Sequence, residues 1–340
     1  MRNPVLIELT RGALVESVHA GAVAVVRADG SVAASVGDIA APVFPRSAIK
    51  PLQAIPFLAT GAADAFGFGT REIALACASH SGTPAHTSVV AAMLQRAGLS
   101  AAALACGVHE PLDAATARAM IRAGAAPSPL HHNCSGKHAG MLATAVHMRE
   151  PTDGYWRPDH PVQLRIARAL EQMTGWRIMP HVCGIDGCSV PNWAMPLEAL
   201  ALAFIRLASG QDVTTEHAPA CRRIAQACWE HPDLVAGPGR LDTAVMERLP
   251  GKVLMKAGAE GVVCGALPEE GLGFALKIDD GAKRGAEAAA VALLTRFHPD
   301  VATLGPPSSL TNWRGLEVGQ MRAAAGLTAL VQHLPDEAAR

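Results

Sequence analysis

The strongest constraint on the fold is the order in which hydrophobic periods occur along the chain. Short apolar runs that indicate strands lie near both ends, at 21–26, 31–36, 252–256, 262–267 and 273–278. Segments with the helical repeat lie between them, at about 85–97, 113–123, 136–148, 160–174, 196–209 and 217–230. Strands separated in this way share a sheet only if the helices form an insertion. We therefore expect an α+β fold with an antiparallel sheet from both chain ends and an inserted helical region.

This order predicts two subdomains. Residues 1–46 and 250–340 would form the sheet subdomain, with a helix over 282–297 and a tail of loop plus a helix around 317–326. Residues 47–249 would form the mainly helical subdomain, which opens with a helix from near Ser47 to Gly61. Because the sheet is assembled from both ends, we expect one cooperative folding unit.

Composition excludes several classes of partner. A formal net charge of -1 argues against nucleic acid, and no run of eighteen apolar residues predicts a membrane span. Charged residues make up 17% of the chain, below the roughly 25% that is typical, which favours a buried surface and a homodimer. Eight scattered cysteines and a first segment without signal-peptide features indicate a cytoplasmic protein. The expected partner is a small-molecule substrate.

One S-x-x-K motif carries the first candidate chemistry. Ser47 and Lys50 lie one helical turn apart, and a buried lysine that loses its proton can act as base for the serine hydroxyl. Ser79-His80-Ser81 and Lys256-Ala257-Gly258 follow in the order in which S-D-N and K-T-G occur in serine β-lactamases. Together the three segments predict an acyl-transfer site.

A second constellation surrounds the polar stretch from His131 to Met141. Cys134 and Lys137 would flank the start of the helix predicted there, where the helix dipole favours a thiolate. If the glycine-rich loop that contains Cys188 folds over this helix start, two thiolates and an amine can bind zinc. His132 or His138 could replace the lysine. A helix entry that is merely rich in His and Cys is the alternative.

The chain resembles the Rhizobium etli-type L-asparaginases from about Leu14 to Phe297. Five blocks in order carry the resemblance, namely Arg46-Ser47-Ala48-Ile49-Lys50-Pro51, Ala78-Ser79-His80-Ser81-Gly82, Asn133-Cys134-Ser135-Gly136-Lys137-His138, Gly184-Ile185-Asp186-Gly187-Cys188 and Lys256-Ala257-Gly258-Ala259-Glu260-Gly261. The resemblance implies a fold similar to that of serine β-lactamases and glutaminases, a homodimer, zinc, and hydrolysis of L-asparagine to aspartate and ammonia.

The resemblance also assigns roles to residues. It pairs Ser47 with Lys50 and Ser79 with Lys256 in catalysis, and it gives zinc the ligands Cys134, Lys137 and Cys188. The expected substrate-binding residues are Arg46, His80, His138 and Asp186. Arg46 or His80 would pair with the α-carboxylate, and Asp186 with the amine or with water on the metal.

Two other functional classes stay open. A penicillin-recognising or other β-lactamase-fold serine amidohydrolase, including a glutaminase, would share the S-x-x-K chemistry. A non-catalytic zinc-stabilised protein would use the cysteines alone and release no ammonia from any amide.

Overall fold

The computed structural model describes residues 3–334, and the chain divides into two compact units. The first comprises residues 1–48, 195–205 and 255–340, and the second comprises residues 49–194 and 206–254. This division differs from the expected one chiefly in that residues 195–205 cluster with the sheet. Whether the units fold cooperatively stays a prediction.

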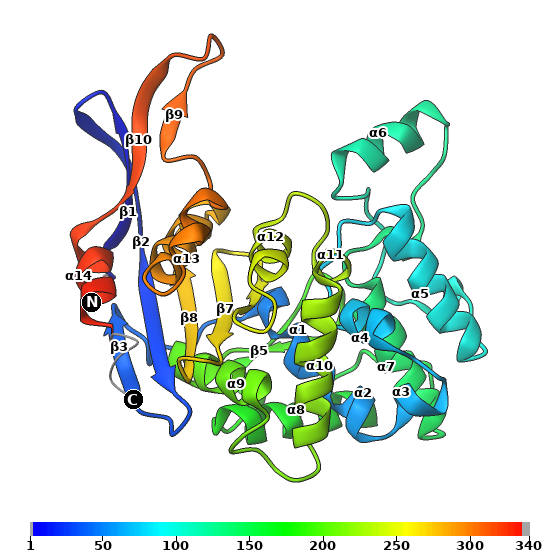
Figure 1. The fold of residues 1–340 in the computed structure, drawn as a ribbon. Coiled ribbons are helices and arrows are strands. Elements are labelled where there is room, and N and C mark those ends of the chain that lie inside the picture. Colours follow the sequence, from blue (N-terminus) through cyan, green and yellow to red (C-terminus); the bar gives the residue numbers. More distant parts are fainter. Residues whose placement is uncertain (1–2, 335–340) are drawn as a thin grey trace. The chain divides into compact units, whose positions relative to one another are not determined.

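The first unit is built on an eight-stranded sheet with strands from both chain ends (Figure 1). The strand order is β6-β7-β8-β2-β1-β10-β9, and β3 also pairs with β2. The strands are β1 (Val5–Arg11), β2 (Leu14–Arg27), β3 (Val32–Val36), β6 (Leu254–Ala257), β7 (Val262–Leu267), β8 (Leu272–Ile278), β9 (Ser309–Thr311) and β10 (Glu317–Ala323). The α+β class and the antiparallel sheet from both ends are confirmed.

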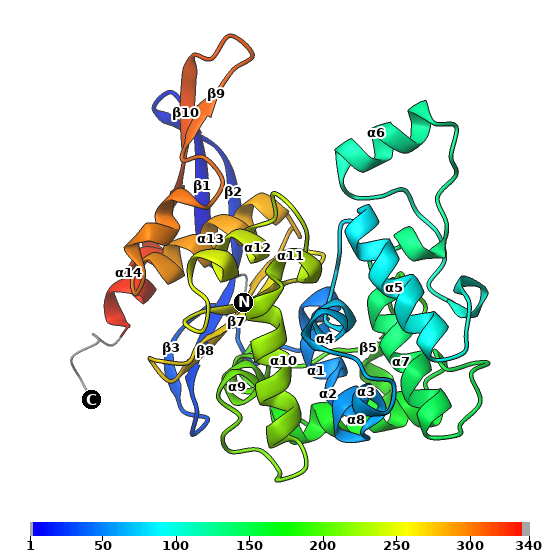
Figure 2. The ribbon, with the colours of Figure 1, turned by 45° about the vertical axis from the view of Figure 1, so that its right-hand side comes forward.

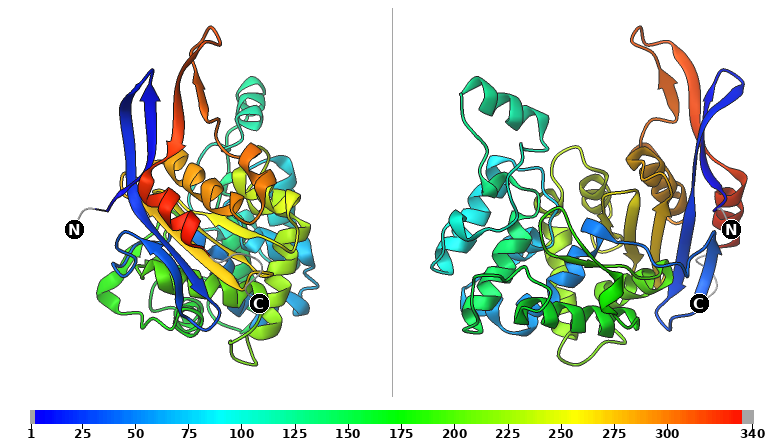
Figure 3. Two further views of the ribbon diagram at one scale, coloured as in Figure 1. Left: turned by 60° about the vertical axis from the view of Figure 1, so that its left-hand side comes forward. Right: turned by 180° about the vertical axis from the view of Figure 1, so that it is seen from behind.

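Helices pack on this sheet where small residues allow a close approach. Helices α13 (Lys283–Thr295) and α14 (Ala325–His333) cover one face of the sheet (Figure 3). A Cβ at Gly285 would lie 2.8 Å from the His19 ring, so a larger residue there would push α13 away from β2. The early turns of α9 (Leu197–Ser209) approach β8 so closely that a Cβ at Gly273 would lie 1.9 Å from the Ala201 carbonyl oxygen.

The second unit is mainly helical, with α7 packed against α4 and α5 (Figure 2). Its helices are α1 (Lys50–Gln53), α2 (Ile55–Ala59), α3 (Ala62–Ala65), α4 (Thr70–Ala76), α5 (Pro84–Arg96), α6 (Ala114–Arg122), α7 (Ser135–His147), α8 (Pro161–Thr174), α10 (Ala218–Glu230), α11 (Pro232–Val235) and α12 (Leu241–Arg248). Strands β4 (Cys183–Ile185) and β5 (Pro191–Trp193) form a small hairpin. The inserted helical region is confirmed, and its six periodic segments begin and end within one residue of their predicted bounds.

Two predictions about local structure are wrong. The helix expected around 317–326 is strand β10 followed by α14, because β10 pairs with β1 and gains a partner that the periodicity did not reveal. The helix expected from Ser47 to Gly61 is interrupted. A 3₁₀ turn over Arg46–Ile49 leads into α1 and then α2, with prolines at the starts of both helices.

Among residues 3–334, no helix is both long enough and apolar enough to cross a bilayer.

Candidate active site

Ser47 lies in a turn whose backbone is constrained on both sides. Arg46 has a φ of 52°, a left-handed conformation that non-glycine residues rarely adopt, and the Ala48 N–H donates to the Pro45 carbonyl at 3.1 Å. The Arg46 guanidinium lies 3.9 Å from the Glu260 carboxylate. Ser47 itself is half-buried, so its hydroxyl keeps some access to solvent. Strain at such a position is frequent at functional sites.

Lys256 and Gly258 belong to the same unit as Ser47, and Gly258 lies near the turn that contains Ser47. The Lys256 side chain is completely buried, and its Nζ donates to the Ala257 carbonyl oxygen at 2.8 Å. A Cβ at Gly258 would lie 2.6 Å from the Pro45 carbonyl oxygen and 3.0 Å from the Ala48 nitrogen. A glycine two residues after Lys256 thus allows the end of β6 to approach the turn that holds Ser47.

The second unit brings Lys50, Ser79 and Asn133 together. Lys50 is buried at the start of α1, and its Nζ donates to the Ala78 carbonyl oxygen at 2.7 Å and lies 3.5 Å from that of Asn133. The next residue, Ser79, accepts a hydrogen bond at Oγ from Asn133 Nδ2 at 3.2 Å. Lys50, the predicted base, and Ser79, the second predicted serine, therefore both lie next to Asn133.

Two cysteines and a lysine converge at the start of α7. Lys137 Nζ lies 3.1 Å from Cys188 Sγ, and the ligand atoms of Cys134, Asp186 and Cys188 all lie within 4.8 Å of one another. A Cβ at Gly136 would lie 2.2 Å from the Leu75 carbonyl oxygen, so glycine lets the first turn of α7 pack tightly on α4. The β4–β5 hairpin supplies Asp186 and Cys188 from its turn. The structure thus brings Lys137 and Cys188 together although they are 51 residues apart in the chain.

The electrostatics of this cluster favour a thiolate. The hydrogen bond from Cys188 holds the pKa of Cys134 well below its usual range, with help from Lys50 and Lys137 and against the effect of burial. That same hydrogen bond and burial raise the pKa of Cys188. Burial lowers the pKa of Lys137, but the charges of Cys188, Cys134 and Asp186 outweigh it and raise the pKa overall. A thiolate is therefore favoured at Cys134, within a group of donors suited to a metal.

His138 provides the observation that a metal fits these residues. Its Nδ1 lies 2.5 Å from the Tyr155 hydroxyl, whereas its buried Nε2 has no hydrogen-bond partner of ordinary geometry within residues 3–334. Burial lowers the pKa of His138 to about 4, and the nearby Cys188 opposes that effect. Sulfur, nitrogen and carboxylate donors in one buried cluster are the ligands that zinc prefers.

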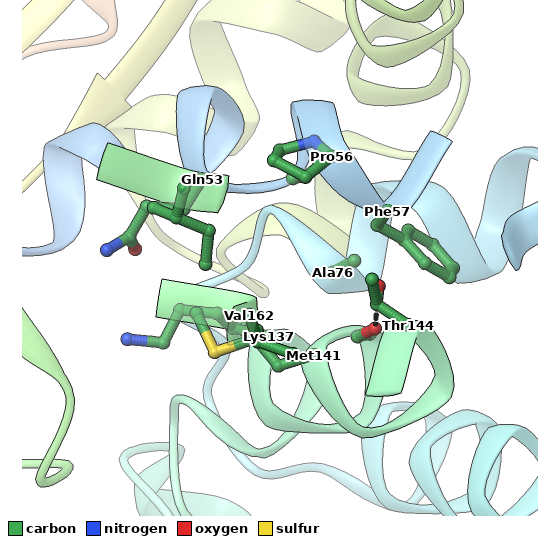
Figure 4. Close-up of a pocket in the computed structure, with 11 residues that line it drawn as sticks. Gln53, Pro56, Phe57, Ala76, Lys137, Met141, Thr144 and Val162 are labelled. Atoms are coloured by element: carbon green, nitrogen blue, oxygen red, sulfur yellow. Dashed lines mark hydrogen bonds between the residues drawn. The ribbon is translucent and has the colours of Figure 1, made fainter. Parts of the chain in front are cut away.

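Lys137 also lines a small cavity (Figure 4). Gln53, Met141 and Thr144 line the same cavity, whose volume is about 10 Å³. This is room for roughly one water molecule. Packing against these residues limits the rotamers of Lys137, which helps to aim its amine at Cys188.

His80 is placed differently from the residues above. It is fully buried, its Nδ1 accepts from the Gly82 N–H at 3.1 Å, and its Nε2 lies 2.8 Å from Ser135 Oγ. It also stacks on His86, with ring centroids 4.9 Å apart. Nδ1 is therefore engaged within its own loop, and Nε2 links that loop to the start of α7.

Some residues at the site escaped the sequence reasoning. Asn133 was noticed only as part of a polar stretch, although its contacts join Lys50, Ser79 and Cys134. Tyr155 was missed altogether, because a single tyrosine in a loop gives no periodic signal. Its being the one tyrosine of the chain was the sole clue.

The chain matches a known protein family over most of its length. A family model described as L-asparaginase II matches residues 7–323. Comparison with curated proteins gives no match. Among solved structures, a probable glutaminase is 16% identical over 78% of this chain and 80% of that chain, with a TM-score of 0.41. A beta-lactamase from Mycobacterium bovis is 12% identical over 78% of this chain and 89% of that chain, with a TM-score of 0.40.

A third solved structure is the covalent complex of a Bacillus subtilis glutaminase with 5-oxo-L-norleucine. It is 12% identical over 84% of this chain and 87% of that chain, with a TM-score of 0.38. Because the TM-scores of these three structures are 0.41, 0.40 and 0.38, they carry no argument about the substrate of the present chain.

Proposed function

The chain belongs to the L-asparaginase II family and is therefore an amidohydrolase, and from this premise we propose that it hydrolyses L-asparagine to L-aspartate and ammonia. The observation that most supports a Ser-Lys mechanism is the burial of the Lys50 amine, which is held 2.7 Å from the carbonyl preceding Ser79. A lysine amine held in such a buried position is the group that we propose as the base for Ser47.

The proposed reaction proceeds through an acyl-enzyme. Lys50 accepts the proton of Ser47 while Ser47 Oγ forms a bond to the side-chain amide carbon of asparagine. The carbon–nitrogen bond then breaks, and the proton taken up by Lys50 passes through Ser79 and Lys256 to the departing amine, which leaves as ammonia. With Lys50 neutral again, water gives it a proton and attacks the ester. Lys50 returns that proton to Ser47 Oγ as the ester bond breaks and aspartate is released.

We also propose zinc as the resident metal, bound by Cys134, Lys137 and Cys188. Bound there, it would supply positive charge that polarises nearby groups and fixes the turn containing Asp186 against α7. Asp186 and His138 lie at this cluster, and Arg46 lies beside Ser47, so all three are retained as proposed substrate-binding residues. His80 is retained only as a residue that positions the Ser79 loop.

An ammonia-release assay tests the proposed substrate. Asparagine, glutamine, other linear amides and the β-lactam nitrocefin are compared at equal enzyme concentration. The highest kcat/KM is expected for asparagine. Faster turnover of glutamine would make the protein a glutaminase, faster turnover of nitrocefin would place it with the penicillin-recognising hydrolases, and no turnover of any amide would overturn catalysis.

Removal of one thiolate tests the metal. Cys188→Ser is expected to lose zinc and to raise KM for asparagine by roughly 10- to 100-fold, with residual kcat, because the metal shapes the pocket and Ser47 remains the nucleophile. Zinc per chain is measured by mass spectrometry together with asparagine kinetics.

Cys183→Ser is the matched control, because Cys183 belongs to the same hairpin and its thiol contacts backbone groups of Gly184 and Asn192. Equal zinc content in the wild type and Cys188→Ser would remove Cys188 as a ligand. Complete loss of kcat together with the metal would contradict the supporting role.

We further propose a homodimer that uses the two adjacent hairpins of the first unit. Their tips project past α13 (Figure 1) and carry five exposed apolar side chains, Leu14, Val15, Val18, Trp313 and Leu316. Exposed apolar residues gathered in one place favour association over solvation. The scatter of eight cysteines through a chain of 340 residues, without a dense framework, supports the proposal that the protein is cytoplasmic.

Trp313→Asp tests this surface. The dissociation constant of the dimer, measured by sedimentation equilibrium, is expected to rise roughly 30-fold or more, as when an aromatic anchor is lost from an interface. Ile121→Asp is the control, since Ile121 is also apolar and exposed but lies on α6. A monomeric wild type would contradict the homodimer, and an unchanged constant in Trp313→Asp would contradict this surface.

A further inference from the structure

Asn133 contacts three residues of the proposed machinery without having a role in it so far. Its carbonyl oxygen accepts from the His80 N–H at 3.1 Å and lies 3.5 Å from Lys50 Nζ. Its own N–H donates to His109 Nε2 at 3.0 Å. These backbone contacts hold the turn before α7 and do not require an asparagine side chain.

The side chain makes contacts of a different kind. Nδ2 donates to Ser79 Oγ at 3.2 Å, and Oδ1 lies 3.3 Å from Cys134 Sγ. A carboxamide is a neutral group that both donates and accepts in one plane, and here its N–H is committed to the Ser79 hydroxyl. The contact with Ser79 does not require a proton on Cys134.

The direction of the hydrogen bond determines what Ser79 can do. A serine hydroxyl has one proton and two lone pairs, and the Asn133 amide occupies one of the lone pairs. The Ser79 proton must then point away from Asn133, toward another acceptor. A hydroxyl oriented in this way is ready to give its proton in the reaction and cannot lose it to its neighbour.

We propose that Asn133 is a positioning residue that orients the Ser79 hydroxyl so that its proton is available to the departing amine. The inference rests on the proposed amidohydrolase mechanism and assigns no contact between Asn133 and the substrate. A purely structural role is separable, since the backbone of Asn133 already holds the turn. The amide side chain should therefore affect the rate of turnover and leave substrate affinity and zinc content nearly unchanged.

A double-mutant cycle of Asn133→Ala with Ser79→Ala tests the inference on the full-length protein. Asn133→Ala is expected to lower kcat for asparagine by about 10- to 100-fold, because a misdirected reacting group costs that much, with KM within about twofold of wild type. In the Ser79→Ala background the same change is expected to have less than about a threefold effect, since the hydroxyl that it positions is gone.

Two further variants distinguish loss of the amide donor from poor folding and from a general effect of substitution near the site. Asn133→Asp has nearly the size of asparagine but only accepts, so it should lose as much kcat as Asn133→Ala even if the alanine variant folds poorly. Ser128→Ala is the control, because Ser128 caps the preceding turn through His131 and lies outside the machinery. Zinc per chain and circular dichroism are measured for every variant.

The outcomes separate the inference from the proposed function. A wild type that releases no ammonia from any amide would overturn both. An active wild type with wild-type kcat in Asn133→Ala or Asn133→Asp would overturn the inference alone. So would losses that multiply in the double mutant, or a loss of kcat that follows loss of zinc.

Discussion

Ser47→Ala is expected to lower kcat for asparagine hydrolysis by roughly 10⁴- to 10⁶-fold, with the protein still folded. The serine supplies the oxygen that forms the acyl-enzyme, and no other group at the turn over Arg46–Ile49 can replace it. Lys50→Ala should cause a similar loss, because a nucleophile and its base act as one unit and removing either removes the step. Ammonia release and thermal denaturation of purified variants check both expectations.

The matched control is Ser88→Ala, which removes an exposed hydroxyl from α5. It should retain wild-type kcat and the same melting temperature as the wild type. Near-native turnover in Ser47→Ala would remove Ser47 as the nucleophile, even if the substrate proves to be asparagine.

Lys256→Met is expected to lower kcat by about 10²- to 10⁴-fold, the range for losing a group that transfers a proton in the transition state. Methionine keeps most of the buried length of the lysine, so the change tests the amine more than the packing. The same amine donates to its own Ala257 carbonyl, so this substitution also removes a local contact. We expect the effect of Lys256→Met to shrink sharply in a Ser79→Ala background, since the two are proposed to share one proton path.

The control is Lys252→Met, which alters an exposed lysine just before β6. Its kcat should match that of the wild type. If the losses from Ser79→Ala and Lys256→Met multiply in the double mutant, the two residues do not share a proton path, and Lys256 would have to be reassigned.

The helical region was predictable because its signal is local. The segments over α5, α6, α7, α8, α9 and α10 repeat apolar residues at helical spacing, and capping residues or prolines mark many of their starts. The strands β7 and β8 were predictable for the same reason, since each is a short apolar run between turn residues. In these segments tertiary structure adds little to the local preference.

The pairing of β1 with β10 was not predictable, because its signal is distant. Strand β1 has only a short apolar run, and β10 mixes Glu317, Gln320 and Arg322 with Met321. Each becomes a strand by pairing with the other across more than 300 residues, for example Ile7 with Ala323. Periodicity within a short window of sequence does not report such pairing, which is why the helix predicted around 317–326 is wrong.

The candidate site was predictable in its residue types more than in its connections. Motifs and spacing pointed to Cys134, Lys137 and Cys188, and the structure brings these residues together. The hydrogen bond from Asn133 to Ser79 joins two loops that are 54 residues apart in the chain, and no sequence motif predicts it. His80 illustrates the opposite case, because a histidine in a polar motif proved to be fully buried and engaged at both nitrogens.

A sheet closed by the two ends of the chain also has a consequence for biosynthesis. On the ribosome β2 is complete long before its partner β8, which begins roughly 245 residues later. At about 5–20 residues per second this delay is on the order of 10–50 seconds. During that interval the apolar run Ala22–Val26 has only β3 beside it, because β1 pairs with an earlier part of β2, and an unpaired strand edge attracts other chains. Yield of native protein should therefore depend on chaperone supply and growth temperature more than the stability of the finished fold would suggest.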